Sequence, residues 1–324
     1  MTSRRDFLRL AASAAALPLA AGPASAQSYP TGVVRIVLGA TAGGGSDIMA
    51  RLMGQWFSER LGQIFIVDDR PGAGSNIATE VVVRAPPDGQ TLLLVTTANA
   101  INATLYEKLK FDFIRDIEPV AGIIRVPLVM VVHPSFPAKT VPEFITYAKA
   151  NPGKINLATG VIGGSPHVAG ELFKTMTGID MAQISYRGLS LALTDVIGGQ
   201  VQVLFSGLPA ASEFIKTGEL RALAVTTAAR APTHPDIPTV SEFIPGFEAS
   251  QWYGIGAPRN TPSRIIEILN KETNAGLADP KLKARLADLG GIALPGSPAD
   301  FRDLIASETE KWGKIIKVSG AKAN

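Results

Sequence analysis

The chain has 324 residues, 31 lysines and arginines against 28 aspartates and glutamates, and a formal net charge of +3. This near balance, without a polybasic run, argues against nucleic acid or an anionic membrane surface as a partner. There is no cysteine, which excludes disulfides, iron–sulfur clusters and thiol chemistry. With 46% hydrophobic residues, the length predicts two domains, each stabilised by its own core.

The first 26 residues predict an export signal. They combine a basic start, an apolar run over 10–21 and small residues that end at Ala26. The pair Arg4-Arg5 resembles a twin-arginine signal. The apolar run is shorter than the roughly 20 residues that span a bilayer. We therefore expect cleavage after Ala26 and a periplasmic mature protein.

Beyond the signal, short β-branched runs alternate with amphipathic runs, which is typical of α/β folds with parallel sheets. The run at 33–39 predicts a strand and 46–62 a helix, which Ser46 or Asp47 can cap and Gly62 ends. Further strands are expected at 64–69, 90–97, 126–133, 155–160, 181–186, 201–207 and 219–227, with helices at 76–85, 140–150, 165–177, 190–198 and 209–217.

The C-terminal part predicts how the two domains are connected. The strand expected at 250–258 is followed only by helices, so it cannot build a sheet of its own. It more plausibly returns to the first domain, which makes the second domain an insertion. We expect lobe 1 to comprise 27–122 and 249–324, and lobe 2 to comprise 123–248.

The first glycine-rich turn also fits a short-chain dehydrogenase. Gly39, Gly43 and Gly45 follow a strand, Asp68 or Asp69 could bind a ribose, and the run 106–110 supplies YxxxK. In such dehydrogenases this tyrosine comes much later, beyond the fourth strand, whereas here it follows only the third. We therefore expect Tyr106 and Lys110 to lie on a surface turn of helix, and no nicotinamide cofactor.

Glycine-rich or hydroxyl-rich turns follow five of the predicted strands, in both domains. They read "ATAGGGSD", "RPGAGSN", "TTANAIN", "ATGVIGGSPH" and "SYRGLS". Parallel sheets bind ligands beyond the carboxyl ends of their strands, so these turns should line one cleft. Where turns lead into helices at Ser46 and Asn76, unpaired N–H groups and the helix dipole suit an anion. The pattern favours an anion cleft over a single nucleotide site.

Catalytic and metal chemistry find no support in the sequence. His133, His167 and His234 are too scattered for a local metal motif. Ser165 lies only two residues before His167 and outside any nucleophile elbow, so it is interpreted as a helix cap. We expect no catalytic residue, no metal and no cofactor.

The chain resembles the Bug-type extracytoplasmic solute receptors of tripartite tricarboxylate transporters over nearly its whole mature length. The most specific segments are "AGGGSDIMAR", "DDRPGAGSNIATEVVVRAPPDGQTLLL", "HVAGELFKTMTGID", "ALTDVIGGQVQVLF", "RALAVTTAARAPTHPDIPTVSE" and "WYGIGAPRNTP". The resemblance implies a type II-like periplasmic binding protein fold, with two lobes of mainly parallel sheet flanked by helices and joined by two crossover strands. It also implies a small carboxylate between the lobes, no catalysis, transient contact with membrane transporter subunits, and a monomer.

The resemblance assigns ligand contacts to loops in both lobes, with Gly72 to Gly74 receiving a carboxylate. Asp195 and the arginines Arg70 and Arg187 are interpreted as residues that brace their turns or assist binding. The expected ligand-binding residues are Ala40, Gly43, Gly44, Gly45, Ser46, Asp47, Gly72, Ala73, Gly74, Ser75, Thr97, Asn99, Gly160, Gly164, Ser165, His167, Tyr186 and Arg187.

Three departures from the family pattern bear on the ligand. Many members carry Pro-Phe where Gly39-Ala40 stands, and Ala40 leaves a larger space. The usual Gly-Gly after "PGAG" is Ser75-Asn76 here. Leu189 and Leu191 add apolar bulk after the last turn. We therefore expect a carboxylate that is larger or more apolar than a short dicarboxylic acid. The alternatives are an NAD(P)-dependent oxidoreductase and a sensory module that presents its ligand to a membrane kinase.

Overall fold

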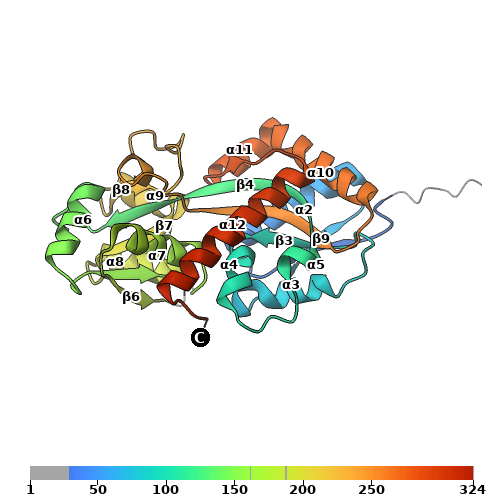
Figure 1. Ribbon diagram of the computed structural model, residues 1–324. Coiled ribbons are helices and arrows are strands. Elements are labelled where there is room, and N and C mark those ends of the chain that lie inside the picture. Colours follow the sequence, from blue (N-terminus) through green and yellow to red (C-terminus); the bar gives the residue numbers. More distant parts are fainter. Residues whose placement is uncertain (1–28, 161, 187, 324) are drawn as a thin grey trace, which may run out of the picture.

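The computed structural model describes residues 29–160, 162–186 and 188–323, which form two lobes side by side (Figure 1). The export signal and Arg187 lie outside the described residues. Within them, no helix combines the length and the apolar character needed to cross a membrane.

The first lobe is built on three parallel strands, each followed by a helix. The strands β1 (Val34–Leu38), β2 (Phe65–Asp69) and β3 (Thr91–Thr96) lie in the order β2-β1-β3. The helices of this lobe are α2 (Gly45–Leu61), α3 (Asn76–Val83), α4 (Thr97–Leu105), α5 (Phe113–Asp116), α10 (Ser263–Ala278) and α11 (Pro280–Asp288).

The second lobe repeats this plan. Its parallel strands β5 (Asn156–Thr159), β6 (Ala182–Ser185) and β7 (Val203–Gly207) lie in the order β7-β5-β6. A further strand, β8 (Arg221–Val225), pairs with β4 in antiparallel fashion. The helices are α6 (Val141–Ala150), α7 (Ser165–Thr177), α8 (Leu189–Ile197) and α9 (Leu208–Lys216).

Two long strands cross between the lobes, as expected. β4 (Ile117–Val132) pairs with β9 (Ser250–Pro258) up to Pro127 and with β7 from Leu128 onward, so one strand belongs to both sheets. β9 and β4 pair in antiparallel fashion. The predicted two-lobed α/β fold is therefore confirmed, with mixed sheets: each lobe has three parallel strands, and β4, β8 and β9 pair in antiparallel fashion.

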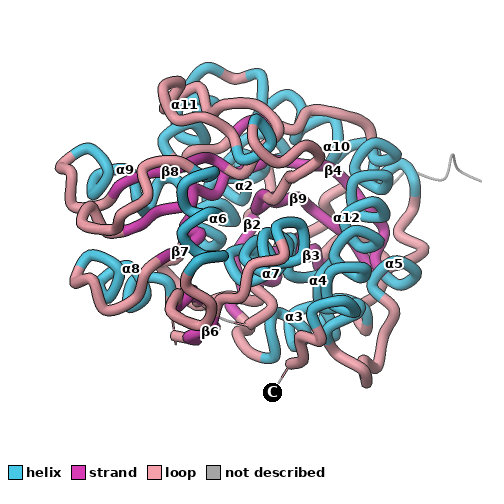
Figure 2. The backbone as a smooth tube through the Cα atoms, turned by 60° about the vertical axis from the view of Figure 1, so that its left-hand side comes forward, coloured by secondary structure: helices cyan, strands magenta, loops and turns pink. Residues whose placement is uncertain are grey.

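The C-terminal helix α12 (Pro298–Ser319) forms a third link that the sequence did not predict. It runs diagonally across both lobes and packs on α4 and α7 (Figures 1 and 2). Its first half places Phe301 in a core of the first lobe. Its second half places Trp312 in the core of the second lobe, which also contains Leu105 of α4. The lobes are thus joined by two strands and one helix.

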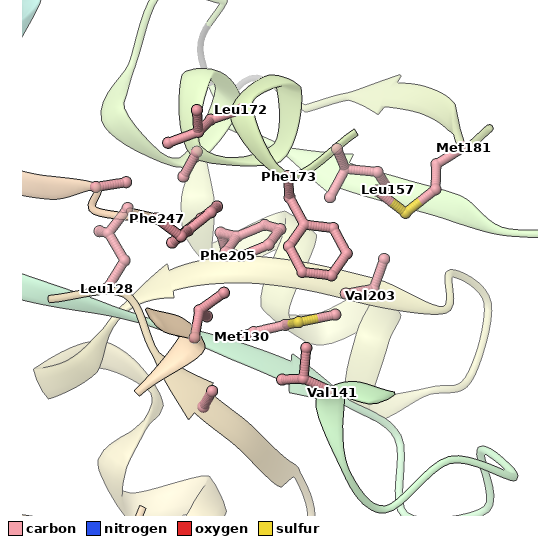
Figure 3. Close-up of a cluster of buried hydrophobic side chains, with 14 of the residues drawn as sticks. Leu128, Met130, Val141, Leu157, Leu172, Phe173, Met181, Val203, Phe205 and Phe247 are labelled. Atoms are coloured by element: carbon pink, nitrogen blue, oxygen red, sulfur yellow. The ribbon is translucent and has the colours of Figure 1, made fainter. Parts of the chain in front are cut away.

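The core of the second lobe fixes the position of α7. Phe173 lies between the helix and the sheet, with its ring centroid 5.7 Å from that of Phe205 and 6.1 Å from that of Phe247 (Figure 3). Leu128 and Met130 of β4 lie on the opposite side of this aromatic group. The crossing strand and α7 are therefore held by one continuous apolar cluster.

Truncating this aromatic side chain should destabilise the protein strongly. Phe173 is fully buried, so Phe173→Ala removes a ring that the neighbours cannot replace, at a cost of about 3–5 kcal/mol. Chemical denaturation would measure the loss. Met176→Ala on the exposed side of the same helix is the matched control and should stay within about 0.5 kcal/mol of the wild type.

Candidate functional site

A cavity of about 520 Å³ lies between the lobes, at the carboxyl ends of the parallel strands. Its volume falls in the usual range of about 300–1,000 Å³ for small-molecule sites. The first lobe contributes loops that follow β1, β2 and β3, and the second contributes 162–165 after β5. Four of the five expected turns therefore converge on one cavity, and the described residues of the fifth, at 185–190, do not line it.

Nine of the predicted site residues line this cavity. They are Ala40, Ser46, Gly72, Ala73, Gly74, Ser75, Thr97, Gly164 and Ser165. Other predicted residues lie nearby without forming the wall, and Arg187 lies outside the described residues. Those off the wall are Gly43, Gly44, Gly45, Asp47, Asn99, Gly160, His167 and Tyr186.

The helices that begin at this cavity leave main-chain donors available. α2 starts after Gly44 and α7 after Gly164, and neither glycine has a side chain that could cap the helix. By contrast, α6 and α12 begin away from the cavity and are capped by the hydroxyls of Thr140 and Ser297. The first N–H groups of a helix have no internal partner. Those of α2 and α7 can thus bind an anion from opposite lobes.

The loop after β2 adds donors in an unusual backbone conformation. Gly72, Ala73, Gly74 and Ser75 have φ values of 129°, 45°, 62° and 81°. Such values are costly for Ala73 and Ser75, by roughly 1–3 kcal/mol each. The Ser75 hydroxyl donates to the carbonyl of Gly39 at 3.2 Å and holds the loop in place. Successive N–H groups in turns of this kind form concave anion sites.

Contact between this loop and β1 requires a glycine at position 39. A Cβ atom added to Gly39 would lie 2.3 Å from the Cβ of Ser75. The amide of Asn102 on α4 also donates to the carbonyl of Gly74. Both contacts fix the loop, within which the Ser75 amide donates to the carbonyl of Gly72 at 3.0 Å.

Asp47 stabilises the first turn and does not face the cavity. Its carboxylate accepts a 2.8 Å hydrogen bond from the Gly43 amide and lies 2.8 Å from Nε of Arg51. The bond from Arg51, with that from Gly43, lowers the pKa of this buried carboxyl group. Asp47 is thus ionised at neutral pH and engaged within its own loop.

Thr97 and Asn99 have different positions at the start of α4. Thr97 lines the cavity, and its hydroxyl accepts a 2.9 Å bond from the Trp252 amide. Asn99 belongs to a capping box, in which its Oδ1 accepts from the Thr96 amide at 2.8 Å. Its Nδ2 donates to Thr79. Asn99 therefore has structural partners on both ends of its amide.

His167 organises the loop of the second lobe. It is 2% exposed, and its Nδ1 accepts a 3.2 Å hydrogen bond from the buried amide of Gly163. Burial lowers the pKa of the imidazole, which stays neutral and can act as an acceptor. The bond shapes the segment that brings Gly164 and Ser165 to the cavity.

The last predicted turn lies outside the cavity wall. The hydroxyl of Tyr186 donates a 2.7 Å bond to the carboxylate of Asp195 on α8. Burial, together with this bond, raises the pKa of Tyr186 to about 12. Gly160 is buried beside the start of α8, close to Leu189. Tyr186 and Asp195 therefore brace this turn, as expected for Asp195.

Two residues of the crossing strand were missed by the sequence analysis. Gln251 lines the cavity with a neutral amide that can both donate and accept. Tyr253 is buried, and its hydroxyl lies beside Gly45 at the start of α2. A polar residue in an otherwise apolar strand at the predicted crossing was the available signal for Gln251.

The lining has no charged side chain among the residues that the structure describes. Its polar groups are hydroxyls, main-chain amides and the amide of Gln251. Nor do the described histidines and carboxylates gather in a group that could hold a metal ion. The site offers neutral hydrogen-bond donors to a ligand and no acid–base pair.

The residues that suggested a dehydrogenase have other partners. Asp68 accepts two hydrogen bonds from Arg70, at 2.9 and 3.2 Å, and lies 3.7 Å from Nη1 of Arg35. Arg70 therefore braces its own turn. We had expected Tyr106 and Lys110 on a surface turn of helix. That expectation is wrong, because α4 ends at Leu105 and both residues lie in the segment that follows it.

Comparisons with known proteins agree on one family. Residues 49–321 match the profile of the tripartite tricarboxylate transporter family receptor. Protein BugT of Bordetella pertussis (strain Tohama I / ATCC BAA-589 / NCTC 13251) is 33% identical over 305 residues, or 93% of this chain and 94% of BugT.

Solved structures of similar fold include periplasmic binding proteins. R. palustris Rpa4515 with adipate is 36% identical, with a TM-score of 0.81 over 90% of this chain and 98% of its own. Periplasmic binding protein BugD is 32% identical, with a TM-score of 0.78 over 91% and 100%. MatC from Rhodopseudomonas palustris with bound malate is 28% identical, with a TM-score of 0.78 over 89% and 100%.

Loss of the His167 acceptor should loosen the second-lobe loop. His167→Phe leaves the buried Gly163 amide without a partner and should cost about 1–3 kcal/mol of unfolding free energy. His167→Asn keeps an oxygen near the position of Nδ1 and should lose less. Denaturant titration of both variants measures the difference, and equal losses would contradict the role of the acceptor.

The same residue predicts a pH dependence. Because the pKa of His167 is lowered in the folded state, the unfolded chain takes up this proton first as pH falls below about 6.5. The stabilising contribution is complete above that pH and decreases below it. Between about pH 7 and about pH 5 the wild type should lose more stability than His167→Asn, as measured by denaturant titration.

Proposed function

Since the chain belongs to the tripartite tricarboxylate transporter family of receptors, we propose that it captures an organic carboxylate in the interlobe cavity. The observation that carries this proposal is the pair of uncapped helix starts of α2 and α7, which reach the cavity wall at Ser46 and Gly164 from opposite lobes. Each supplies main-chain N–H groups and the positive end of a helix dipole. Adipate and malate in the two similar structures are ligands of this chemistry.

The neutral lining narrows the class of ligand. A carboxylate can be held by several main-chain N–H groups without an arginine. An ammonium group would need a carboxylate or several acceptors, but no acidic residue lines the cavity among the residues that the structure describes, and Asp47 at the start of α2 is engaged with Gly43 and Arg51. We infer a carboxylic acid without a positive group. Leu38, Ala40 and Ile162 on the wall favour an apolar body.

Binding follows from the arrangement of the two lobes. A ligand that bridges 72–75 of the first lobe and 162–165 of the second is satisfied from both sides only when the lobes are close. It therefore stabilises the closed state by its differential contacts. We propose that membrane subunits of a transporter recognise this state transiently, and that the protein acts as a monomer without enzymatic activity.

The location follows from the same family. BugD is a periplasmic binding protein, and we propose that this chain is likewise exported and cleaved after Ala26. We also propose the division into 27–122 plus 249–324 and 123–248. The change of strand partner at Pro127 and Leu128 in β4, and the start of β9 at Ser250, support this division within a few residues.

A thermal-shift screen tests the proposed function. Adipate, malate, benzoate and phenylacetate are the probes, and NAD is the negative control. A ligand at 100 times its dissociation constant stabilises the native state by about 2.7 kcal/mol. Stabilisation by at least one acid and none by NAD is the expected outcome. Stabilisation by NAD alone would favour the oxidoreductase instead.

Gly72→Ala should abolish that stabilisation. Gly72 has a φ of 129°, so a side chain strains the loop, and its Cβ would lie 2.6 Å from Cδ1 of Ile77. The matched control is Gly153→Ala, at a φ of 72° with nothing within 4 Å of the added Cβ and no place on the cavity wall. Both variants should lose stability, but only Gly72→Ala should lose the ligand-induced shift in calorimetry.

Ala40→Phe should change ligand preference by filling the cavity. The new ring would occupy part of the space that an aromatic acid needs, so phenylacetate should lose affinity by at least about tenfold relative to adipate. Titration calorimetry with both acids measures the ratio. If the wild type binds adipate and neither aromatic acid, the inference of a bulky apolar ligand is wrong.

A further inference from the structure

Four charged residues meet where the three links between the lobes lie together. Arg125 is on β4, Glu248 precedes β9, and Glu308 and Lys311 are on α12. Nη1 of Arg125 lies 2.6 Å from Oε1 of Glu248, whose Oε2 lies 2.7 Å from Nζ of Lys311. Nζ of Lys311 is also 2.5 Å from Oε1 of Glu308. We call these four residues the hinge cluster.

Glu308 connects the cluster to the cores of both lobes. Its side chain is 4% exposed, and Oε2 accepts bonds from the indole N–H groups of Trp252 at 3.1 Å and Trp312 at 2.9 Å. Trp252 belongs to a core of the first lobe and Trp312 to that of the second. One carboxylate thus joins a side chain from each core.

The same contacts reach the floor of the cavity. The main-chain amide of Trp252 donates to the hydroxyl of Thr97, which lines the cavity and begins α4. The residue before Trp252 is Gln251, which also lines the cavity. A shift of β9 relative to α12 would therefore displace both Thr97 and Gln251.

The charges of the hinge cluster balance one another, and their partial burial makes the cluster sensitive to the loss of any one charge. Burial alone would raise the pKa of Glu248, but Lys311 and Arg125 outweigh it, so that pKa is below its ordinary value. Two cations and two carboxylates alternate across the three links. Removing one member leaves a partly buried charge without its partner, which is energetically costly. We expect β4, β9 or α12 to shift so that this charge regains contact with water.

We propose that Arg125, Glu248, Glu308 and Lys311 position the two lobes for ligand binding by fixing β4, β9 and α12 relative to one another. Lys311 has the central role, because it alone bridges the carboxylates of the β9 and α12 links. It acts on the ligand through Trp252, Thr97 and Gln251 and does not touch it. The expected effect of the cluster on ligand affinity rests on the proposed function. The expected effect on the geometry of the lobes is independent of it.

The test compares lobe separation and affinity in charge variants of Lys311. The chain has no cysteine, so Lys149→Cys on α6 and Lys271→Cys on α10, both exposed, can carry spin labels without background. Lys311→Met removes the charge and Lys311→Arg keeps it. Glu310→Gln is the control, because it removes an exposed ion pair with Lys314 on the same helix.

We expect Lys311→Met to broaden the distance distribution of the ligand-free protein and to weaken adipate binding about tenfold. Lys311→Arg should restore both, and Glu310→Gln should match the wild type. Glu308→Gln should have the same effects as Lys311→Met. If Glu308→Gln does not fold, the comparison of Lys311→Met with Lys311→Arg is sufficient to test the proposal. Wild-type distances and affinity in Lys311→Met, or equal losses in Lys311→Met and Lys311→Arg, would overturn the proposal. Failure of the wild type to bind any acid would overturn the proposed function instead, while the ligand-free distances still test the cluster.

Discussion

Main-chain N–H groups at helix starts are the interaction on which this structure depends. Several helices that begin away from the cavity are capped by a hydroxyl or carboxylate, as at Thr140 and Asp279, whereas α8 and α9 begin after Gly188 and Gly207 without a side-chain cap. At the cavity, α2 and α7 also begin after a glycine, so no capping side chain occupies the donors that a ligand needs, while Thr96 caps α4. Gly44 and Gly164 therefore leave main-chain donors free for a ligand. Uncharged donors also explain why no cation is required beside the carboxylate.

The connections between the lobes limit how they can move. β4 pairs with β9 up to Pro127 and with β7 from Leu128, so any rotation of the lobes must take place about this continuous strand. α12 adds a stronger constraint, because Trp312 shares one core with Leu105 of α4 and Phe173 of α7. Closure must preserve this packing, which favours small rotations over a wide opening. Two of the helices that begin at the cavity, α4 and α7, are thus held together through α12.

Local sequence patterns were sufficient to predict a helix or turn whose ends are determined by its own residues. The helix expected at 165–177 is α7 with the same bounds, because Pro166 and Gly178 mark its ends. The start of β4 at Ile117 was missed, since Pro119 and Gly122 interrupt the apolar run and are accommodated by irregular pairing with β9. Asn99 was expected at the ligand, but the capping box engages its Oδ1 and Thr79 accepts from its Nδ2. The role of α12 depends on contacts between distant segments, which no local pattern contains.

Division of the donors between two lobes also determines how a ligand can leave. An arginine on one lobe would hold a carboxylate whether the cleft is open or closed. Here the donors at 72–75 and at 162–165 lie on opposite sides, so each lobe alone satisfies only part of the ligand. Opening the cleft removes one set of hydrogen bonds at once and weakens binding without any change in charge. A partner that stabilises the open form therefore releases the ligand by geometry alone, and the elements that fix the angle between the lobes also set the affinity.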